Sequence, residues 1–416
     1  MRRRIVVTGM GAVTPYGTAD DMWQAMTEGR SAITRIEHNW ADHVPVKIAG
    51  QVLNFDPLQF ISRKEVRRIS RPSQFAIAAA EMAKADAKLS DSLINHERVA
   101  VVLGTTMGPH LLAESMTSAY RVNGHKRPNP VHFANCLPNM PAFFVSERVK
   151  ALGSVRTPVA ACATGTQALG DASELIRTGR ADVVYAGGVE AIVQDYIIAG
   201  FASMSALAEG YEDCPEEASR PFSADRSGFV LSEGAGVLVL EERVHALERN
   251  APIYAEVIGQ ASSADAYHIA MIDPAASGMQ RAMKWALQDA AITTDEVDYI
   301  NAHGTSTPPN DLLETQAMKA VFGDHAHNLK ISSVKSMVGH AMAAAGALEA
   351  ISTIRTLQTG YIPPTINLLT PDAECDLNYV PNHGEQIKAG LKVAMSNNFG
   401  LGGQNASVVF RRYDGG

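Results

Sequence analysis

The segment ACATGTQALGDASELIRTGRADVVYAGG (161–188) joins a helix pattern to a buried strand, and it decides the fold class. From Ala168 onward, apolar side chains recur at the i, i+1, i+4, i+7 and i+8 positions that turn one helix face inward. Gly179 is a natural C-cap for that helix. VVYAGG (183–188) lacks polar alternation, which is typical of a strand buried on both faces. A helix that leads directly into such a strand predicts an α/β layered architecture.

Runs of the same kind, rich in Val and Ile, recur along the whole chain. They lie at 5–9, 99–104, 183–188, 237–242, 254–259, 297–304, 330–334, 393–397 and 406–410. The longer segments between them fit crossover helices. Strands and helices are therefore expected to alternate from one end of the chain to the other.

The second half of the chain loosely repeats the first. VAVVLGTT (99–106) has a counterpart in VDYINAHGTST (297–307). Downstream of each, a polar turn opens a helix of small residues, at 161–176 and at 334–351. We therefore expect an internally duplicated fold, with the functional site where the two halves face each other.

Bulk composition sets outer limits on the function. The 416 residues fit two halves, 1–250 and 251–416, and no Pro-rich linker separates them. A formal net charge of −8 argues against a nucleic-acid binder that relies on overall charge. No apolar run is long enough to span a membrane, and the start MRRRIVVTGMG is too short and Gly-interrupted for a signal peptide. We expect a cytoplasmic protein.

Cys162 is the strongest candidate nucleophile among the four cysteines. It lies where the polar turn enters the small-residue helix, so the positive end of the helix dipole favours the thiolate that thioester exchange needs. The alternative is a buried structural cysteine, which is how we interpret Cys136, Cys214 and Cys375. Because the cysteines are far apart and form no CxxC pair, neither a disulfide framework nor a metal site is expected.

Two histidines stand at comparable places in the second half. His303 follows a buried strand and precedes Gly304, and His340 lies at the start of an Ala-rich helix, which favours a neutral ring. Two neutral imidazoles that donate to one oxygen can hold an enolate in a dry site. Lys335 needs a partner if it is buried, and we expect Glu314 to be that partner.

A glycine-rich turn, SNNFGLGGQN (396–405), follows the last buried strand but one. One interpretation is an ordinary tight loop, since glycine alone is weak evidence. The other is a mobile gate, in which the backbone N–H of Phe399 joins that of Cys162 to form an oxyanion hole.

Four motifs, in this order along the chain, resemble the β-ketoacyl-acyl carrier protein synthases. They are ACATGTQALG, NAHGTSTP, KSMVGHAMAAAG and SNNFGLGGQN. The likeness is to the synthase II type of bacterial fatty-acid elongation, and it runs nearly end to end. It implies a thiolase-like five-layer α-β-α-β-α fold built from two pseudo-repeated halves, active as a homodimer.

The resemblance also implies a reaction and its residues. Cys162 would accept an acyl group from the phosphopantetheine arm of an acyl carrier protein, so the enzyme itself needs no cofactor. Malonyl-carrier protein would then lose CO2 while His303 and His340 hold the enolate, whose carbon attacks the acyl-Cys thioester. Lys335 and Glu314 resemble the family's orienting charged pair.

Further positions are carried over from the family as substrate contacts. They are Thr305 and Thr307 for the pantetheine amides, Met107 and Phe133 for the acyl pocket, and Gly400 and Gly402 in the gate. Phe133 would act across the dimer interface. GTTMG stands where the family usually has GSGIG, and GLGGQ replaces its GFGG, so the acyl pocket and the gate depart from the usual pattern.

A basic segment suggests where the carrier protein docks. SRKEVRRISR gathers Arg63, Lys64, Arg67, Arg68 and Arg71, and positions 64, 67, 68 and 71 share one face of the expected helix. Charge runs are usually solvated helix faces. Acyl carrier proteins are acidic, however, and the family docks them at this stretch, so we interpret the cluster as the docking site.

Three rival functions stay open. The serious one is the same chemistry in specialised metabolism, on an unusual acyl chain. A catalytically silent partner subunit would lack Cys162, which is present in an intact motif. A cysteine hydrolase would need only one base, so the paired histidines do not favour it.

Overall fold

The large strands lie side by side in one sheet. The computed structural model describes residues 3–127 and 129–415. Among these residues the sheet runs through β10 (Lys330–Ser332), β9 (Tyr299–Asn301), β13 (Val393–Gly400), β14 (Gln404–Arg412), β8 (Ala255–Ala264), β1 (Ile5–Val13), β7 (Gly234–Glu242), β6 (Val183–Glu190), β4 (Val99–Gly104) and β5 (Val155–Arg156). Most of these strands are buried along their whole length, as their Val- and Ile-rich runs predict.

The strand order is repeated. Numbered along the chain within each half, the strands lie from the sheet edge to its middle in the order third, second, fourth, fifth, first. In the first half this order is β5, β4, β6, β7, β1, and in the second half it is β10, β9, β13, β14, β8. In each half the second strand runs parallel to the third and fourth, and the fifth is antiparallel to its neighbours. The halves join where β1 pairs with β8. This repeat supports the predicted duplication, and the division after residue 250 stays a prediction.

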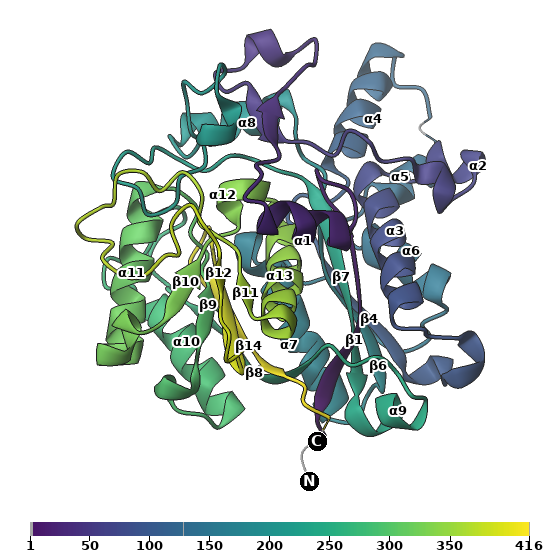
Figure 1. The fold of residues 1–416 in the computed structure, drawn as a ribbon. Helices are drawn as coiled ribbons and strands as arrows, with labels where there is room; N and C mark the ends of the chain where they lie inside the picture. The colour runs from purple at the N-terminus through teal and green to yellow at the C-terminus, as the bar shows by residue number, and fades with distance from the viewer. Residues whose placement is uncertain (1–2, 128, 416) are drawn as a thin grey trace.

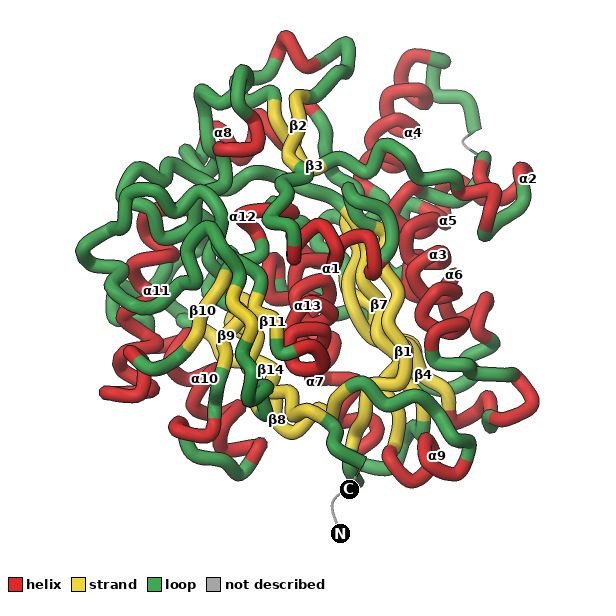
Figure 2. Tube along the Cα trace, in the orientation of Figure 1, coloured by secondary structure: helices red, strands yellow, loops and turns green. Residues whose placement is uncertain are grey.

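Helices cover both faces of the sheet and fill the space between its halves (Figure 1). They are α3 (Arg71–Asp86), α6 (Met140–Val149), α7 (Thr164–Arg177), α10 (Ser277–Ala290), α11 (Pro308–Phe322) and α13 (Ala345–Thr359). Helices α7 and α13 pack on each other between the half-sheets, whereas α3 with α6, and α10 with α11, lie outside (Figure 2). The layers are therefore α-β-α-β-α, and the predicted thiolase-like five-layer fold is confirmed.

The described residues also form further α-helices and two small two-stranded sheets. The helices are α1 (Ala19–Thr27), α2 (Arg63–Val66), α4 (His110–Val122), α5 (Pro130–Asn135), α8 (Asp195–Ser203), α9 (Arg243–Glu248) and α12 (Lys335–Val338), and the small strands are β2 (Ile33–Arg35), β3 (Ile48–Gly50), β11 (Tyr361–Ile362) and β12 (Glu385–Gln386). Within the described part of the chain, no helix has the length and apolarity needed to cross a membrane.

Small residues bring the two inner helices close together. A Cβ on Gly165 of α7 would lie 2.7 Å from the carbonyl oxygen of Ala343, and one on Gly346 of α13 would lie 2.3 Å from the Oγ1 atom of Thr166. Larger side chains here would push the helices apart. Because α7 and α13 meet near their N-terminal ends, the residues just before each helix face each other, and these residues include Cys162 and His340.

Candidate active site

Three predicted side chains converge where the inner helices begin. The Sγ atom of Cys162 and one ring nitrogen each of His303 and His340 lie within 4.8 Å of one another. Cys162 lies in the 3-10 turn that precedes α7, His340 lies just before the equivalent turn ahead of α13, and His303 follows β9. The two rings are almost completely buried, and Cys162 keeps 8% of its surface exposed.

The chain enters both inner helices through the same local bend. Ala161 has φ +47°, and Met342 has φ +49° at the equivalent place before α13. A left-handed conformation costs about 1–2 kcal/mol for a residue other than glycine. The two halves therefore share this strained backbone conformation. The bend lies next to Cys162 in one half and close to His340 in the other, so the two residues lie beside each other.

Burial, rather than the helix dipole, dominates the ionisation of Cys162. Desolvation raises the pKa of the thiol to about 11, against smaller lowering effects from the backbone N–H of Leu401 and the charge of Lys335. The thiol is therefore protonated at neutral pH in this structure, whereas a helix N-terminus alone would favour the thiolate. The thiol has to lose its proton as the acyl group arrives.

One backbone amide beside the nucleophile is that of Leu401. Its N–H lies near the Cys162 thiol and lowers the pKa of that group. The Phe399 ring packs edge-on against His303, with ring centroids 5.8 Å apart. An oxyanion hole formed by the backbone N–H groups of Phe399 and Cys162 stays a prediction.

Both imidazoles are held as the tautomer with its proton on Nε2. The Nδ1 atom of His303 faces two donors, Lys335 Nζ at 3.3 Å and Asn398 Nδ2 at 3.2 Å. Nδ1 of His340 accepts from the backbone N–H of Met342 at 3.3 Å, and its buried Nε2 has no partner among the described residues. Burial, followed by the charge of Lys335, lowers the pKa of both rings well below the usual value, so both are neutral.

A buried charged network orients His303. Lys335 Nζ pairs with Glu349 of α13 and donates to the His303 carbonyl oxygen at 2.7 Å. Asn398 Nδ2 donates to the other Glu349 oxygen at 2.7 Å. The expected partner of Lys335, Glu314, is therefore wrong. Neither Glu349 nor Asn398 was singled out in the sequence, although Asn398 lies inside SNNFGLGGQN and Glu349 follows KSMVGHAMAAAG by three residues.

Glu314 acts on the backbone instead. Its two carboxylate oxygens accept from the N–H groups of His303 and Gly304, each at 2.8 Å. Burial raises the pKa of Glu314 to about 7, against the lowering effect of these two amides. Glu314 thus fixes the turn that carries His303 rather than neutralising Lys335.

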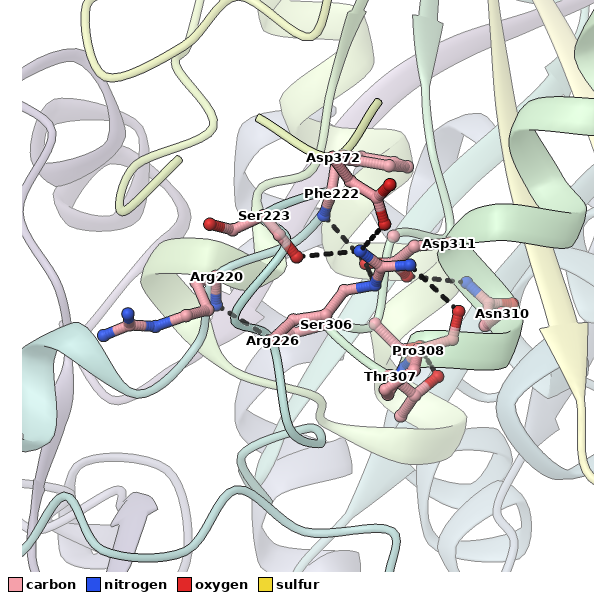
Figure 3. A network of polar contacts seen from close by, with 12 residues as sticks. Arg220, Phe222, Ser223, Arg226, Ser306, Thr307, Pro308, Asn310, Asp311 and Asp372 are labelled. Carbon is pink, nitrogen blue, oxygen red and sulfur yellow. Dashed lines mark hydrogen bonds and ion pairs between the residues drawn. The ribbon is translucent and has the colours of Figure 1, made fainter. Parts of the chain in front are cut away.

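A second polar network braces the loop after His303 (Figure 3). The buried guanidinium of Arg226 donates to Asp372 at 2.6 Å and to the carbonyl oxygen of Pro308 at 3.1 Å, and it lies 3.7 Å from Asp311. Asp311 accepts from the backbone N–H of Phe222 at 2.9 Å. Because Arg226 and Phe222 precede β7, this network ties the first half to the loop that carries Thr305 and Thr307.

The predicted substrate residues lie at different distances from the centre. The Oγ1 atoms of Thr305 and Thr307 are 2.8 Å apart on the loop after His303. Met107 packs against the apolar cluster that contains Cys162. Phe133, on α5, is 64% exposed in the single chain.

The two gate glycines are held in different ways. A Cβ on Gly400 would lie 2.6 Å from the Ala160 carbonyl oxygen. The exposed Gly402 has φ +84°, a conformation that favours glycine. Close packing therefore requires glycine at 400, and backbone conformation favours it at 402.

The basic segment is organised differently from the prediction. Helix α2 is only four residues long, and Arg71 begins α3 and pairs with Glu233 at 2.9 Å. The shared helical face of 64, 67, 68 and 71 is therefore wrong, because the chain turns before α3. The four others remain exposed, and the described residues offer them no ion pair: Arg63, Lys64, Arg67 and Arg68.

The Cys–His–His cluster also has the composition of a metal site, since thiolate and imidazole are common zinc ligands. The tautomers of the two histidines argue against metal binding. Metal binding requires a bare ring nitrogen, and the donors around both Nδ1 atoms leave the proton on Nε2, which faces the centre in His340. The arrangement is suited to donating hydrogen bonds to a substrate oxygen.

Comparisons with known proteins agree with this geometry. The sequence model described as "Beta-ketoacyl synthase, N-terminal domain" matches residues 2–246, and "Beta-ketoacyl synthase, C-terminal domain" matches 254–369. Proteins named 3-oxoacyl-acyl-carrier-protein synthase 2 from Synechocystis sp. and Coxiella burnetii are each 42% identical, over 99% of both chains. A ketosynthase solved in complex with its type II PKS acyl-carrier protein superposes with a TM-score of 0.90, at 35% identity over 100% of each chain. The chain belongs to the β-ketoacyl synthase family.

Proposed function

We propose that the protein is a β-ketoacyl-acyl carrier protein synthase of fatty-acid chain elongation. It joins an acyl group held on Cys162 to malonyl-acyl carrier protein, by decarboxylative Claisen condensation. The observation that carries this function is the arrangement of the two neutral rings, whose Nδ1 atoms are occupied, around a buried thiol. The relatives named 3-oxoacyl-acyl-carrier-protein synthase 2 support the assignment to elongation.

In the first half-reaction, Cys162 exchanges thioesters with an acyl carrier protein. The thiol attacks the acyl carbon, the bond to the phosphopantetheine sulfur breaks, and the departing carrier thiol takes the proton. The backbone N–H groups of Cys162 and Phe399 would donate to the oxyanion that forms, and the N–H of Leu401 also lies near the sulfur. Phosphopantetheine therefore arrives on the carrier, and the chain needs no cofactor of its own for this step.

In the second half-reaction, the two imidazoles stabilise an enolate. Malonyl-carrier protein loses CO2, and the electron pair left behind is delocalised onto the thioester oxygen. Nε2–H donors on His303 and His340 would hold this oxygen, in a site dry enough for neutral donors to count strongly. The enolate carbon then attacks the acyl-Cys162 carbonyl carbon, and the thiol is released. Thr305 and Thr307 support the pantetheine arm through their hydroxyl groups.

The carrier protein docks at the basic surface formed by Arg63, Lys64, Arg67 and Arg68. These exposed cations make no ion pair among the described residues, so they are free to meet an acidic partner. The structural relative in complex with its acyl-carrier protein supports a partner of this kind.

The active form is a homodimer. Exposed apolar side chains gather on and around α5, α6 and the edge strand β5: Val131, Phe133, Leu137, Phe143, Val155 and Val159. Exposed apolar side chains beside an open sheet edge are consistent with a protein interface. In the dimer, Phe133 would line the acyl pocket of the other copy.

The experiment that tests the function separates the two half-reactions. Incubation with acyl-carrier protein should add one acyl group to the wild type, detected by intact-protein mass spectrometry, and Cys162→Ala should remain unlabelled. His303→Ala should still become acylated but lose decarboxylation of malonyl-carrier protein, measured as released CO2. Full labelling of Cys162→Ala would overturn the nucleophile assignment, and loss of acylation alone in His303→Ala would assign that ring another role.

A second candidate is the same chemistry in a specialised pathway. The observation that favours it is the superposition on a ketosynthase described as bound to a hexaketide. Product masses from a panel of acyl-carrier proteins of graded chain length distinguish the two. A single two-carbon extension of saturated chains supports elongation, whereas repeated extension without reduction supports the specialised pathway.

A further inference from the structure

A buried glutamate outside the site described above lies at the end of β6. The side chain of Glu190 is fully buried, and it makes no ion pair among the described residues. Its carboxylate accepts three hydrogen bonds from the turn that follows β4. The donors are the backbone N–H groups of Thr106 at 2.8 Å and Met107 at 3.1 Å, and the hydroxyl of Thr105 at 3.0 Å.

Burial of a carboxylate in this position lowers the stability of the folded protein. Removing its charge from water without a buried cation is strongly unfavourable, and the donors of the turn offset only part of that loss. Burial raises the pKa of Glu190, and the amides of Thr106 and Met107 lower it. An apolar side chain at the end of β6 would be less unfavourable to bury than a carboxylate. Stability therefore does not explain why Glu190 holds this turn, and another explanation is required.

The other half of the molecule contains the same device. Glu314 accepts two consecutive backbone N–H groups, those of His303 and Gly304, from the turn that follows β9. Strands β4 and β9 are each the second strand of their half-sheet. The turn held by Glu190 is therefore the structural counterpart of the turn that carries His303.

The turn held by Glu190 has two contacts with the nucleophile's surroundings. The side chain of Met107 packs against the apolar cluster that contains Cys162. The hydroxyl of Thr106 lies 3.3 Å from the carbonyl oxygen of Ala161 and donates to it. Ala161 is the left-handed residue directly before Cys162. Glu190 is thus one hydrogen bond away from Met107 and two hydrogen bonds away from Ala161, the residue before the nucleophile.

We propose that Glu190 is a positioning residue for the first half-reaction, which sets the acyl-chain preference by fixing Met107 and the rate of acyl transfer by fixing Ala161 before Cys162. The inference rests on the proposed function. Glu190 touches no reacting atom itself and acts through the turn 105–107.

The test is Glu190→Gln, assayed in the two half-reactions separately. The amide can accept through only one oxygen, and its NH2 group would face a backbone N–H, so the turn should relax. We expect the rate of Cys162 acylation to fall about tenfold, as for the loss of a hydrogen bond to a buried charged group. We also expect the ranking of acyl-chain lengths to change. Decarboxylation of malonyl-carrier protein should stay within about twofold of wild type, because the His303 turn keeps Glu314.

A matched control removes a buried carboxylate far from the site. Glu241 of β7 is fully buried and is held by Arg249 and His245, away from the turn 105–107. Glu241→Gln should slow both half-reactions by one common factor, through loss of folded protein. If Glu190→Gln behaves in that way, or leaves acylation rate and chain preference unchanged while wild type is acylated, the proposal is overturned. If wild type is not acylated, the proposed function itself fails.

Two further variants decide the matter if Glu190→Gln does not fold. Thr106→Val removes only the hydroxyl that donates to Ala161, so acylation should slow while chain preference is kept. Met107→Ala shortens the side chain that packs against the Cys162 cluster, so chain preference should shift. The proposal fails if Thr106→Val does not slow acylation and Met107→Ala does not shift the acyl-chain preference.

Discussion

The two halves of the molecule share a scaffold but surround their reactive groups differently. Each has the same strand order, a left-handed residue before its inner helix, and a buried glutamate that holds the turn after its second strand. Cys162 is packed among apolar side chains and the two imidazoles, and Lys335 and Glu349 act on its thiol through their charges alone, without a hydrogen bond. Around His303 the neighbours include the buried ions Lys335 and Glu349.

This difference follows the chemistry of the two half-reactions. Thioester exchange begins and ends with neutral groups, so a dry pocket and one or two amides suffice for its oxyanion. Enolate stabilisation needs two rings whose protons point at one place, and a neutral imidazole has two tautomers. Buried donors at Nδ1 select one of them. The charged groups are therefore concentrated in the half that must control a proton.

The largest effect should come from breaking the buried ion pair in the second half. Lys335→Met leaves Glu349 without its cation and removes a donor from the His303 carbonyl oxygen. We expect the free energy of unfolding to fall by about 3–5 kcal/mol, which denaturant titration would measure. The double variant Lys335→Met with Glu349→Gln should regain part of this loss, since no lone charge then remains. Equal stability of the single and double variants would contradict a charge-based account.

These neighbours show how far the sequence could predict the site. Cys162, His303 and His340 could be assigned because each lies at a strand end or a helix start, where topology alone brings them together. The partner of Lys335 could not, because spacing along the chain does not show which carboxylate of α11 or α13 reaches a given point. Glu314 lies closer to the His303 turn, and Glu349 meets Lys335 from α13.

Helix α2 was predicted too long, although the sequence marks the break. The cap of α2, Ser62 with Glu65, and the proline in the first turn of α3, Pro72, can both be read from the sequence as starts of two separate helices.

A smaller effect should distinguish the glutamates by pH. Burial raises the pKa of Glu314 from 4.5 to about 7, so the folded protein binds a proton more tightly there than the unfolded chain. Stability from this group is then present below about pH 4.5 and is lost as pH rises to about 7, by roughly 3 kcal/mol. Unfolding of wild type and Glu314→Gln should be compared at pH 5 and pH 8. The wild type should lose more stability than the variant on going to pH 8.

The comparison of wild type with Glu190→Gln should give a difference of the same sign, since burial also raises the pKa of Glu190. The wild type should again lose more stability than the variant on going to pH 8. A difference between wild type and either variant that does not depend on pH would show that the carboxyl group is not the titrating one.

The smallest effect should treat both half-reactions alike. Arg67 and Arg68 are exposed on the first half, but the acyl-carrier and the malonyl-carrier protein have to dock at one surface to reach one sulfur. Charge reversal of both residues to Glu should raise KM for each carrier protein about tenfold at low salt, with kcat nearly unchanged. The effect should shrink at high ionic strength, because exposed charges are screened. A rise in KM for only one carrier protein would mean that the two halves are served by separate docking surfaces, and the shared scaffold would then not extend to substrate delivery.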